Sequence, residues 1–297
     1  MVALALAVLT ACDSGGEAPA TGSSASASST GPSSAAPSAA GRSDLPTPDH
    51  VMVVIFENED AKNIVGGPEA PYLTSLAGSG ATFTDAHGEL HPSQPNYLAL
   101  FSGSTQGVTD DSCPLTLSGP TLASELAAAG HSFTGYSEDL PSAGFTGCQA
   151  GRYARKHNPW VNFADLPAVV NQPYSALPAD FADLPTVSIV VPNLCNDMHD
   201  CGVSAGDRWA GQNLPAFVAW AQAHNSLLVV TFDEDNGSSA NHIATVLVGP
   251  MVVTGTYDQR IDHYSLLRTL EDMYGLPPIG RAATAAPLTG VWTSTPG

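Results

Sequence analysis

Residues 51–60 of the chain read VMVVIFENED, and this stretch decides the fold. Residues 51–56 are apolar without interruption, a pattern typical of a strand that is buried on both faces of a parallel sheet. The polar residues 57–60 follow at once. Because open α/β sheets bind their ligands at the carboxyl ends of the strands, we expect Glu57 and Asn58 to lie at a functional site.

The rest of the chain repeats this alternation of strand and helix. We expect further strands at residues 81–86, 131–136, 186–191, 226–232 and 243–248. We expect helices at residues 72–77, 121–129, 208–224 and 263–274, the third of them capped by Asp207. The pattern predicts an α/β fold with a mostly parallel central sheet flanked by helices. Residues 49–297 are few enough to form one domain with a well-buried core.

The N-terminal residues indicate an exported protein. Residues 2–9 are apolar and Cys12 follows, so residues 1–11 resemble a bacterial lipoprotein signal peptide, which is cleaved before a lipidated cysteine. The apolar run is too short to span a bilayer, and an ordinary secretory leader is the alternative. No Lys or Arg precedes the run, which leaves open a start upstream of Met1. We expect an extracytoplasmic protein, either a cell-surface lipoprotein anchored to the membrane or a secreted protein.

A tether is expected after this leader. Residues 13–48 are almost entirely Ser, Ala, Gly, Pro and Thr and show no periodic apolar face. Such a segment cannot bury enough apolar surface to offset its chain entropy. We therefore expect residues 12–48 to comprise the lipidated Cys12 and a disordered tether, with a mean reach of roughly 30–35 Å.

The charge of the chain excludes one class of partner. It has 28 acidic and 9 basic side chains, for a net charge of −19. Binding to nucleic acid depends on clustered Lys and Arg, so we expect no nucleic-acid partner. Three of the nine basic residues, together with His157, lie within residues 151–160. This stretch is either a solvated surface loop or, in so acidic a chain, a binding region for an anionic substrate.

Four cysteines remain when Cys12 is set aside, namely Cys113, Cys148, Cys195 and Cys201. An even number in an oxidising compartment favours disulfides, and more than one pairing is possible. We expect Cys113–Cys148 and Cys195–Cys201, because each pair closes a loop within its own region. A zinc site is the competing interpretation, but neither pair has CxxC spacing.

Ser93 occupies an unusual position. The stretch HPSQPNYLALF, residues 91–101, places this serine between two prolines and ahead of an apolar helix. Proline is tolerated in the first turn of a helix, so Ser93 should lie at or beside a helix N-cap. Free backbone N–H groups and the helix dipole favour an anion there. Ser93 is therefore either a capping residue or a nucleophile, and a nucleophile needs partners elsewhere in the chain.

Acids or carboxamides follow three of the apolar strands. These groups are Glu57-Asn58, residues 193–200 and Asp233-Glu234. Parallel strands bring such ends to one edge of a sheet, where the carboxylates repel one another unless a cation is bound, so we expect a divalent metal. Oxygen ligands suit Mg, Ca or Mn and do not exclude Zn. For any single acid, a solvated strand end is the alternative.

Several segments together carry a family resemblance. Besides HPSQPNYLALF they are YARKHNPW at residues 153–160, PNLCNDMHD at 192–200, TFDED at 231–235 and HYSLLRTLE at 263–271. They resemble the bacterial phosphoesterase family, which contains secreted acid phosphatases and phospholipases C within the alkaline-phosphatase superfamily. The resemblance covers nearly all of residues 49–292 in order. It implies an alkaline-phosphatase-like fold and makes residues 49–297 a phosphoesterase catalytic domain.

The resemblance also implies a nucleophile and a metal site. Ser93 would attack the phosphorus and form a phosphoseryl intermediate, which water then hydrolyses. The metal would be held by Glu57, Asn58, Asp233 and Glu234, with Ser93 Oγ as a further ligand.

Further implied roles concern the substrate. His157 and His199 would contact the transferring phosphoryl group or protonate the leaving oxygen, and Lys156 would add positive charge nearby. Asn96 and His91 would bind the phosphate or substrate, with the alternative that His91 only braces the loop before Ser93. Chemically, this is phosphoryl transfer by positioning and neutralisation of charge.

The expected function is metal-dependent, acid phosphatase-like hydrolysis of phosphate monoesters. The substrate would be a small phosphorylated compound or a phospholipid headgroup, phosphoinositides included. A phospholipase C-type phosphodiesterase is one alternative, although the larger members of that branch carry extra domains for which this chain is too short. A non-enzymatic surface lipoprotein is the other, although a binding protein does not need the whole set of strand-end acids.

Overall fold

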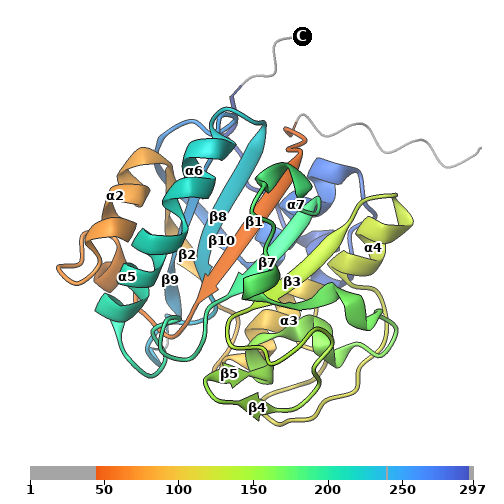
Figure 1. Ribbon diagram of the computed structural model, residues 1–297. Coiled ribbons are helices and arrows are strands. Elements are labelled where there is room, and N and C mark those ends of the chain that lie inside the picture. The colour runs from red at the N-terminus through yellow and green to blue at the C-terminus, as the bar shows by residue number, and fades with distance from the viewer. Residues whose placement is uncertain (1–44, 239, 294–297) are drawn as a thin grey trace, which may run out of the picture. The chain divides into compact units, whose positions relative to one another are not determined.

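The apolar runs form one central sheet. A computed structural model of the protein describes residues 45–238 and 240–293. The strands of the sheet are β1 His50–Phe56, β2 Ala81–His87, β3 Phe133–Ser137, β6 Asn171–Pro173, β7 Val187–Val191, β8 Ser226–Phe232, β9 His242–Val248 and β10 Gly255–Asp262. Their order is β10-β2-β9-β8-β1-β7-β3-β6. β1 holds the apolar run 51–56 and pairs in parallel with β8 and β7, so it lies inside the sheet (Figure 1).

β9 is the one strand of the described sheet that runs against its neighbours. It is antiparallel to both β8 and β2, whereas every other pairing in the sheet is parallel. The connection from β8 to β9 spans only residues 233–241, and a connection this short joins antiparallel strands, since parallel ones need a longer crossover. The prediction of a mostly parallel sheet is confirmed.

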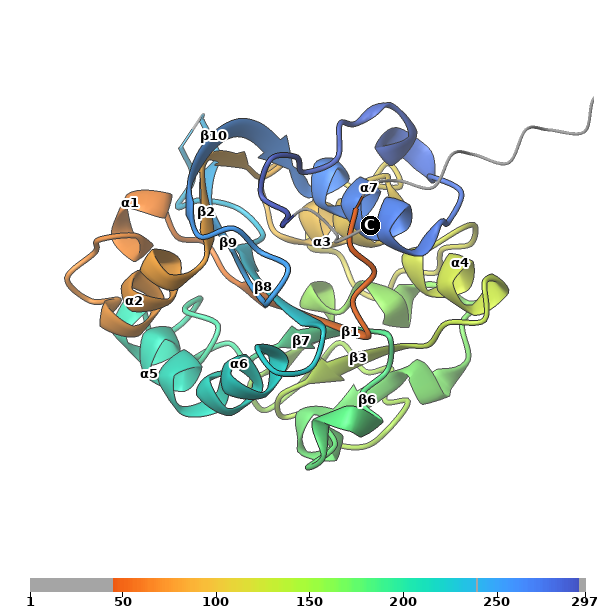
Figure 2. The same ribbon diagram turned by 90° about the horizontal axis from the view of Figure 1, so that it is seen from above.

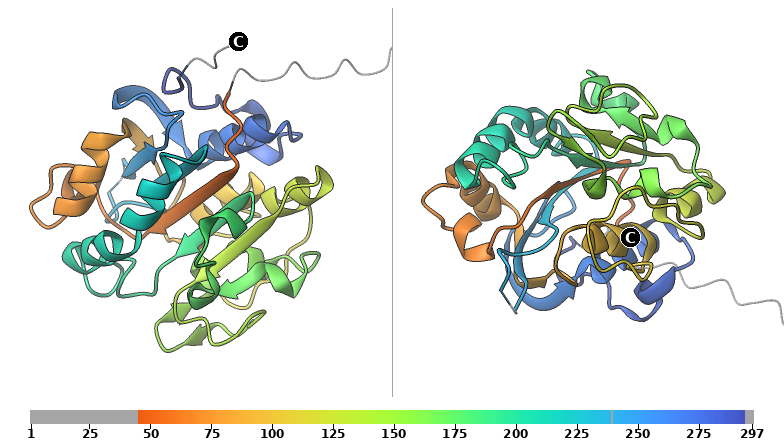
Figure 3. Two further views of the ribbon diagram at one scale, coloured as in Figure 1. Left: turned by 45° about the horizontal axis from the view of Figure 1, so that its top comes forward. Right: turned by 90° about the horizontal axis from the view of Figure 1, so that it is seen from below.

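Helices cover both faces of this sheet, as predicted. One face carries α1 Ala61–Ile64, α2 Pro71–Ser79, α5 Val203–Asn213 and α6 Pro215–Ala221. The other face carries α3 Gln94–Ser102, α4 Leu122–Ala128 and α7 His263–Tyr274. Figure 2 shows the two groups on opposite sides of the strands, and both views in Figure 3 agree with this division. Short 3-10 turns lie at Arg155–His157, Pro159–Asn162, Ala168–Val170, Tyr174–Ala176, Phe181–Asp183 and Gly280–Thr284.

The single helix predicted over residues 208–224 is wrong. The chain forms α5 and α6 there, and the break falls at Pro215, which cannot donate a helical hydrogen bond. Asp207 does not cap its own helix, because α5 already begins at Val203. Its buried carboxylate instead accepts the backbone N–H groups of Tyr72 at 3.2 Å and Leu73 at 2.8 Å, and so joins α5 to the start of α2.

The edge strands β10 and β6 were not predicted from the sequence. β10 pairs only with β2, and its residues alternate between partly buried and exposed, so it lacks the continuous apolar pattern of the central strands. β6 is short and contains Pro173. A separate two-stranded hairpin, β4 Gln149–Ala150 and β5 Tyr153–Ala154, precedes the turn that carries Lys156 and His157.

The segment that follows His157 is anchored in the core by Trp160. This indole is 1% exposed and its Nε1 donates to Asn171 Oδ1 at 2.9 Å. It packs directly on Gly135 in β3, where a Cβ atom would lie 2.1 Å from Trp160 Cε2. The packing of Trp160 against β3 therefore fixes the position of residues 155–162.

Both predicted disulfides are present. Cys113 is bonded to Cys148 and Cys195 to Cys201. Neither pair is therefore left to form the alternative zinc site.

The predicted signal peptide (residues 1–11), Cys12 and most of the predicted tether lie outside the described residues. The last tether positions do not: Thr47 Oγ1 donates to the carbonyl of Met273 at 3.0 Å, and the Pro48 carbonyl accepts from the Tyr274 hydroxyl at 3.0 Å. Among residues 45–238 and 240–293, no helix has the length and apolar character needed to cross a membrane.

Candidate active site

Polar residues from three neighbouring strands meet at one edge of the sheet. β8, β1 and β7 are adjacent and parallel, so their carboxyl ends lie side by side. Glu57 and Asn58 follow β1, Asp233 and Glu234 follow β8, and residues 193–201 follow β7. The backbone N–H of Glu57 donates to the carbonyl of Asp197 at 2.9 Å, which ties the ends of β1 and β7 together.

Ser93 lies at this edge, at the start of α3. It occupies the N-cap position and is 1% exposed, yet its side chain makes no capping hydrogen bond within the described residues. Its hydroxyl is 2.9 Å from Glu57 Oε2 and 3.2 Å from Glu234 Oε1. A hydroxyl has a single proton and cannot donate fully to both carboxylates. Ser93 is therefore aimed at the acids instead of at its own helix.

The backbone of this helix start does not offer its N–H groups to a ligand as the sequence suggested. The Gln94 N–H donates to Asp111 Oδ1 at 3.0 Å, and the Asn96 N–H donates to the Ser93 carbonyl at 2.9 Å. Pro95, between them, has no N–H. The N–H groups of residues 94–96 are therefore not available to an anion at Ser93, which depends on the helix dipole, the N–H of Ser93 itself and the side chains described below.

The acids of the site are buried together. Glu57, Asp197, Asp233 and Glu234 are between 0% and 2% exposed. Burial raises the pKa of Glu57 well above its usual range, and the charges of Asp233 and Asp197 add to this effect. Burial and the neighbouring Glu234 likewise raise the pKa of Asp233 well above its usual range. Burial raises the pKa of Asp197 to about 7.

These groups suit a hard divalent cation. Asn58 Nδ2 donates to Glu234 Oε1 at 2.6 Å, which turns its Oδ1 away, and no partner for this buried oxygen exists among the described residues. Asp233 Oδ2 is also buried and has no hydrogen-bond partner among the described residues. Buried oxygens without partners are costly, and a cation would satisfy them and lower the raised pKa values. Glu57, Asn58, Asp233, Glu234 and Ser93 Oγ thus form a donor set of the kind that Mg, Ca or Mn prefers.

A second set of possible ligands shares Glu57. One ligand atom each from Glu57, His157 and His199 lie within 4.8 Å of one another. Nitrogen donors such as these suit Zn better than the oxygen set does. His199, however, stands 3.4 Å from the Lys156 ammonium, and a cation beside that charge would be repelled. We therefore favour the oxygen set for the metal.

His157 is held between two acids. Its Nε2 lies 3.2 Å from Glu57 Oε1 and its Nδ1 lies 3.3 Å from Asp197 Oδ2. Neither contact is aligned as a hydrogen bond, since His157 Nε2 and Asp197 Oδ2 both lack partners among the described residues. Burial, with the nearby Lys156 charge, lowers the pKa of His157 well below its usual range. The ring of Tyr97 stacks on His157 at 5.3 Å, and its hydroxyl donates to Glu57 Oε1.

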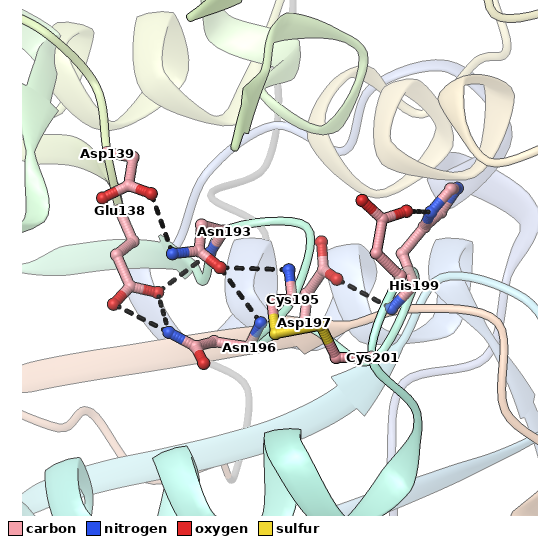
Figure 4. Close-up of a disulfide and its surroundings, with 9 residues drawn as sticks. Glu138, Asp139, Asn193, Cys195, Asn196, Asp197, His199 and Cys201 are labelled. Carbon is pink, nitrogen blue, oxygen red and sulfur yellow. Dashed lines mark hydrogen bonds and ion pairs between the residues drawn. A yellow bond between two sulfur atoms is a disulfide. The ribbon is translucent and has the colours of Figure 1, made fainter. Parts of the chain in front are cut away.

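His199 and Asp197 lie in the loop that the Cys195–Cys201 disulfide closes (Figure 4). The His199 N–H donates to Asp197 Oδ1 at 2.9 Å. The ring Nδ1 donates to Asp200 Oδ1 at 2.8 Å, which leaves Nε2 free to face Lys156.

Two further residues fix the start of the same loop. Glu138 accepts both the Asn193 N–H at 3.0 Å and the side-chain amide of Asn196 at 2.9 Å (Figure 4). Asn193 Oδ1 in turn accepts the N–H groups of Cys195 and Asn196. The loop is thus fixed to Glu138 at its beginning by hydrogen bonds, and the disulfide joins its two ends.

The basic stretch 151–160 contributes less charge than its composition suggested. Arg155 is 7% exposed and turns inward, where its guanidinium donates to Asn162 Oδ1 at 3.0 Å and to the carbonyls of Thr146 and Leu115. Arg152 is exposed. Lys156 is the member of the three that reaches the site, with its Nζ 2.8 Å from Asp111 Oδ2.

Asn96 and His91, predicted to bind substrate, lie beside Ser93 and make hydrogen bonds to the residues around it. Asn96 Oδ1 accepts the N–H groups of Glu89 and Leu90, and its Nδ2 donates to the Leu90 carbonyl at 2.8 Å. His91 Nδ1 bonds to Glu234 Oε2 and its Nε2 donates to the Ser238 carbonyl at 3.1 Å. These bonds brace the loop, which for His91 is the alternative that the sequence left open.

Several contributors to the site were missed from sequence. Tyr97 read only as part of an apolar helix, and Asp111 lies in a segment without any recognisable motif. His263, the first residue of α7, is 2% exposed and its Nε2 donates to the Asp233 carbonyl at 2.7 Å. Asp197 lies two residues before His199 in the segment 192–200, and Asp235 follows Glu234 in the segment 231–235, but neither acid was assigned a role.

The arrangement can perform one kind of chemistry well. A buried serine hydroxyl faces carboxylates that suit a cation, and a lysine and two histidines line the other side. Such a site can activate a hydroxyl and neutralise an anionic group beside it.

Comparisons with known proteins agree with this chemistry. A model of the Phosphoesterase family matches residues 66–277. A phosphatidylinositol-3-phosphatase from Mycobacterium tuberculosis is 51% identical over 253 residues, which cover 84% of this chain and 85% of that protein. A phosphate-repressible acid phosphatase from Penicillium chrysogenum is 32% identical, covering 70% of this chain but only 55% of the fungal protein.

Solved structures show the fold. A protein of the alkaline phosphatase superfamily from Vibrio parahaemolyticus superposes with a TM-score of 0.57 and 15% identity, covering 84% of this chain and 72% of that one. A lipoteichoic acid synthase from Listeria monocytogenes gives a TM-score of 0.53 and 11% identity, covering 83% and 74% of the two chains. The fold is thus alkaline-phosphatase-like, and the chain belongs to the Phosphoesterase family, as a hydrolase that acts on phosphoric ester bonds.

Proposed function

We propose that this protein is a metal-dependent phosphomonoesterase that works through a phosphoserine at Ser93. The observation that carries the proposal is the Ser93 hydroxyl, which is buried at a helix start and turned toward Glu57 and Glu234 in place of a capping bond. A serine that only capped its helix would accept from the second or third N–H of that helix. A serine facing two buried carboxylates has the surroundings of an activated nucleophile.

The residues of the chain divide the work of the first step. A divalent cation held by Glu57, Asn58, Asp233 and Glu234 would lower the pKa of the serine hydroxyl and offset negative charge on the phosphoryl group. Ser93 Oγ forms the bond to phosphorus as the bond to the leaving oxygen breaks. The Ser93 proton passes to a neighbouring carboxylate, of which Glu57 Oε2 at 2.9 Å is the nearer.

Two histidines serve different purposes in this scheme. His157 is buried and its pKa is lowered, so it acts as a neutral donor to a phosphoryl oxygen. His199 has a 33% exposed side chain and is oriented by Asp200, so it is better placed to deliver a proton to the leaving oxygen. Water then attacks the phosphoserine and returns the Ser93 hydroxyl with release of inorganic phosphate.

The substrate class follows from the charge of the site. Lys156 is the basic side chain that the described residues bring to it, which suits a single phosphate group better than a polyphosphate. The 51% identical relative is a phosphatidylinositol-3-phosphatase, so phosphoinositides belong among the candidate substrates together with soluble phosphate monoesters.

An extracytoplasmic location fits this function. The two disulfides support an oxidising compartment. A lipid anchor at Cys12 rests on the sequence of residues 1–12 and would place the enzyme at a membrane surface, near phospholipid headgroups.

Turnover of p-nitrophenyl phosphate tests the proposal. We expect chelation to abolish activity and a divalent ion to restore it. Ser93→Ala should lower kcat by at least about 10³-fold. Ser102→Ala is the matched control, since Ser102 lies in the same helix and its hydroxyl bonds to the Leu98 and Ser104 carbonyls and to Gln106, none of which belongs to the site. Full activity of Ser93→Ala would contradict the proposed mechanism. Turnover of bis-p-nitrophenyl phosphate that is faster than turnover of p-nitrophenyl phosphate would indicate a phosphodiesterase.

A further inference from the structure

Asp111 contacts two parts of the site that are far apart in the sequence. Its Oδ1 accepts the backbone N–H of Gln94 at 3.0 Å, directly after Ser93. Its Oδ2 accepts from Lys156 Nζ at 2.8 Å. One carboxylate therefore joins the start of α3, directly after Ser93, to the ammonium group of Lys156.

The segment that carries Asp111 is itself fixed on both sides. Gln94 Nε2 donates to the carbonyls of Asp110 at 3.1 Å and Ser112 at 2.9 Å. Cys113 is bonded to Cys148, whose carbonyl accepts the N–H of Arg155 at 2.9 Å. Because Arg155 precedes Lys156, these contacts form a closed ring that the Asp111–Lys156 pair completes.

The pair stands where its geometry affects the substrate. The side chains of Lys156 and Asp111 are 21% and 27% exposed, so their interaction is less screened than that of a pair on the open surface. Lys156 Nζ also lies 3.4 Å from His199 Nε2. A lysine has a long flexible side chain, and its partner decides where the charge comes to rest.

We propose that Asp111 is a positioning residue for phosphoryl transfer, which holds Lys156 beside His199 and fixes the start of α3 behind Ser93. This inference rests on the proposed function, in which Ser93 is the nucleophile and Lys156 meets the phosphate. The two tasks can be separated by substitution. Asp111→Asn keeps an oxygen that accepts the Gln94 N–H but loses the charge that holds Lys156, whereas Asp111→Ala loses both.

The experiment compares Asp111→Asn, Asp111→Ala, Lys156→Met and the double variant Asp111→Asn/Lys156→Met in the metal-loaded protein. Inorganic phosphate binding is measured by calorimetry, and kcat and KM are measured with p-nitrophenyl phosphate. We expect Asp111→Asn to weaken phosphate binding and raise KM by about 5-fold while kcat changes less than about 2-fold. Asp111→Ala should also lower kcat by about 10-fold, because the helix start loses its acceptor.

The double variant decides whether Asp111 acts through Lys156. We expect it to bind phosphate as Lys156→Met does, with no additional loss. Asp110→Asn is the matched control: the Asp110 side chain accepts the Ser112 N–H and should leave both constants unchanged. Wild-type phosphate affinity in Asp111→Asn, or losses that multiply in the double variant, would overturn the proposal.

The two proposals can fail separately. Phosphate binding does not require turnover, so an active Ser93→Ala would remove the proposed function while the binding cycle still decides the role of Asp111. If Asp111→Ala does not fold, phosphate binding by Asp111→Asn, Lys156→Met and their double variant is sufficient to support or overturn that role.

Discussion

Glu57, Asp233 and Glu234 extend directly from β1 and β8, whereas Lys156 lies in the 3-10 turn Arg155–His157 and His199 lies in the loop that the Cys195–Cys201 disulfide closes. The first three, with Asn58, we call the strand half of the site; Lys156, His199 and Asp111 we call the loop half. The strand-half acids are at most 2% exposed, while the side chains of the loop half are between 21% and 33% exposed. Backbone pairing inside the sheet positions the strand half, and side-chain bonds and disulfides position the loop half.

The difference indicates how each half has been optimised. The strand half gathers repelling carboxylates in a rigid setting, so it favours a bound cation over the stability of the metal-free protein. The loop half pairs each charge with a partner before a substrate arrives. Substitutions should therefore act on the two halves in different ways.

The largest effect is expected in the strand half, for Asp233→Asn. This change should lower kcat by on the order of 10³-fold, because it weakens the cation site. It should also stabilise the metal-free protein by about 1 kcal/mol, since it replaces an acid whose ionisation is opposed by burial and by Glu234 with a neutral amide. Steady-state kinetics measure kcat, and thermal unfolding in chelator measures the stability of the metal-free protein. Asp258→Asn, at an exposed position, is the control. A destabilised, inactive variant would show that Asp233 is needed for folding instead.

The chelated protein should lose stability as the pH rises. The folded-state pKa of Asp197 is about 7, above its ordinary value of 3.8, so the folded state binds the proton more tightly than the unfolded state. The stabilising contribution is full below about pH 4 and is lost as the pH rises through 7, about 4 kcal/mol in all.

Thermal unfolding in chelator between pH 5 and 8 checks this expectation. The midpoint should fall by about 5–10 °C over that range, and Asp197→Asn should flatten the dependence. A midpoint that rises with pH would contradict the assignment of this buried acid.

A smaller effect is expected in the loop half, for the double substitution Cys195→Ser/Cys201→Ser. Loss of this short covalent loop should cost about 2 kcal/mol of stability. It should lower kcat by about 10-fold, because His199 is no longer held in place. Metal affinity should stay the same, since the oxygen ligands belong to the strand half. A change in metal affinity would favour His199 as a ligand, which calorimetry with Mg, Mn and Zn can detect.

The smallest effect is expected for Arg152→Gln. The Arg152 side chain is exposed and has no hydrogen bond to the site among the described residues, and its backbone bond to Leu194 does not depend on the side chain, so KM should change less than about 2-fold. Lys156→Met, measured in parallel, should raise KM far more than Arg152→Gln does. Equal effects of the two variants would mean that the whole stretch 151–160 attracts the substrate by its charge.

The strand half could be predicted from sequence because its signals are local. A continuous apolar run marks a buried strand, and the next residues must lie at its carboxyl end; Glu57 and Asp233 follow directly. The sheet order, which places β1 between β7 and β8, could not be inferred from these runs alone, but any order of parallel strands brings their ends to one edge.

The loop half was harder because its contacts join distant segments. Nothing local separates Arg155, which turns into the core, from Lys156, which reaches the site. Asp111 gains its role only through Gln94 and Lys156, which are 17 and 45 residues away. The misplaced cap at Asp207 has the same origin, because this carboxylate bonds to α2, which lies 134 residues away, instead of to its own helix.

Gly135 has a consequence for how variants of this protein should be interpreted. Trp160 occupies the space where a methyl group would stand, and the same indole anchors the turn that leads back to Lys156 and His157. A single added carbon there would push the ring and shift both side chains, although Gly135 contacts no ligand. In a screen for lost activity, a substitution at Gly135 will therefore resemble a substitution of an active-site residue. Distance from the phosphate site alone does not predict which positions tolerate change.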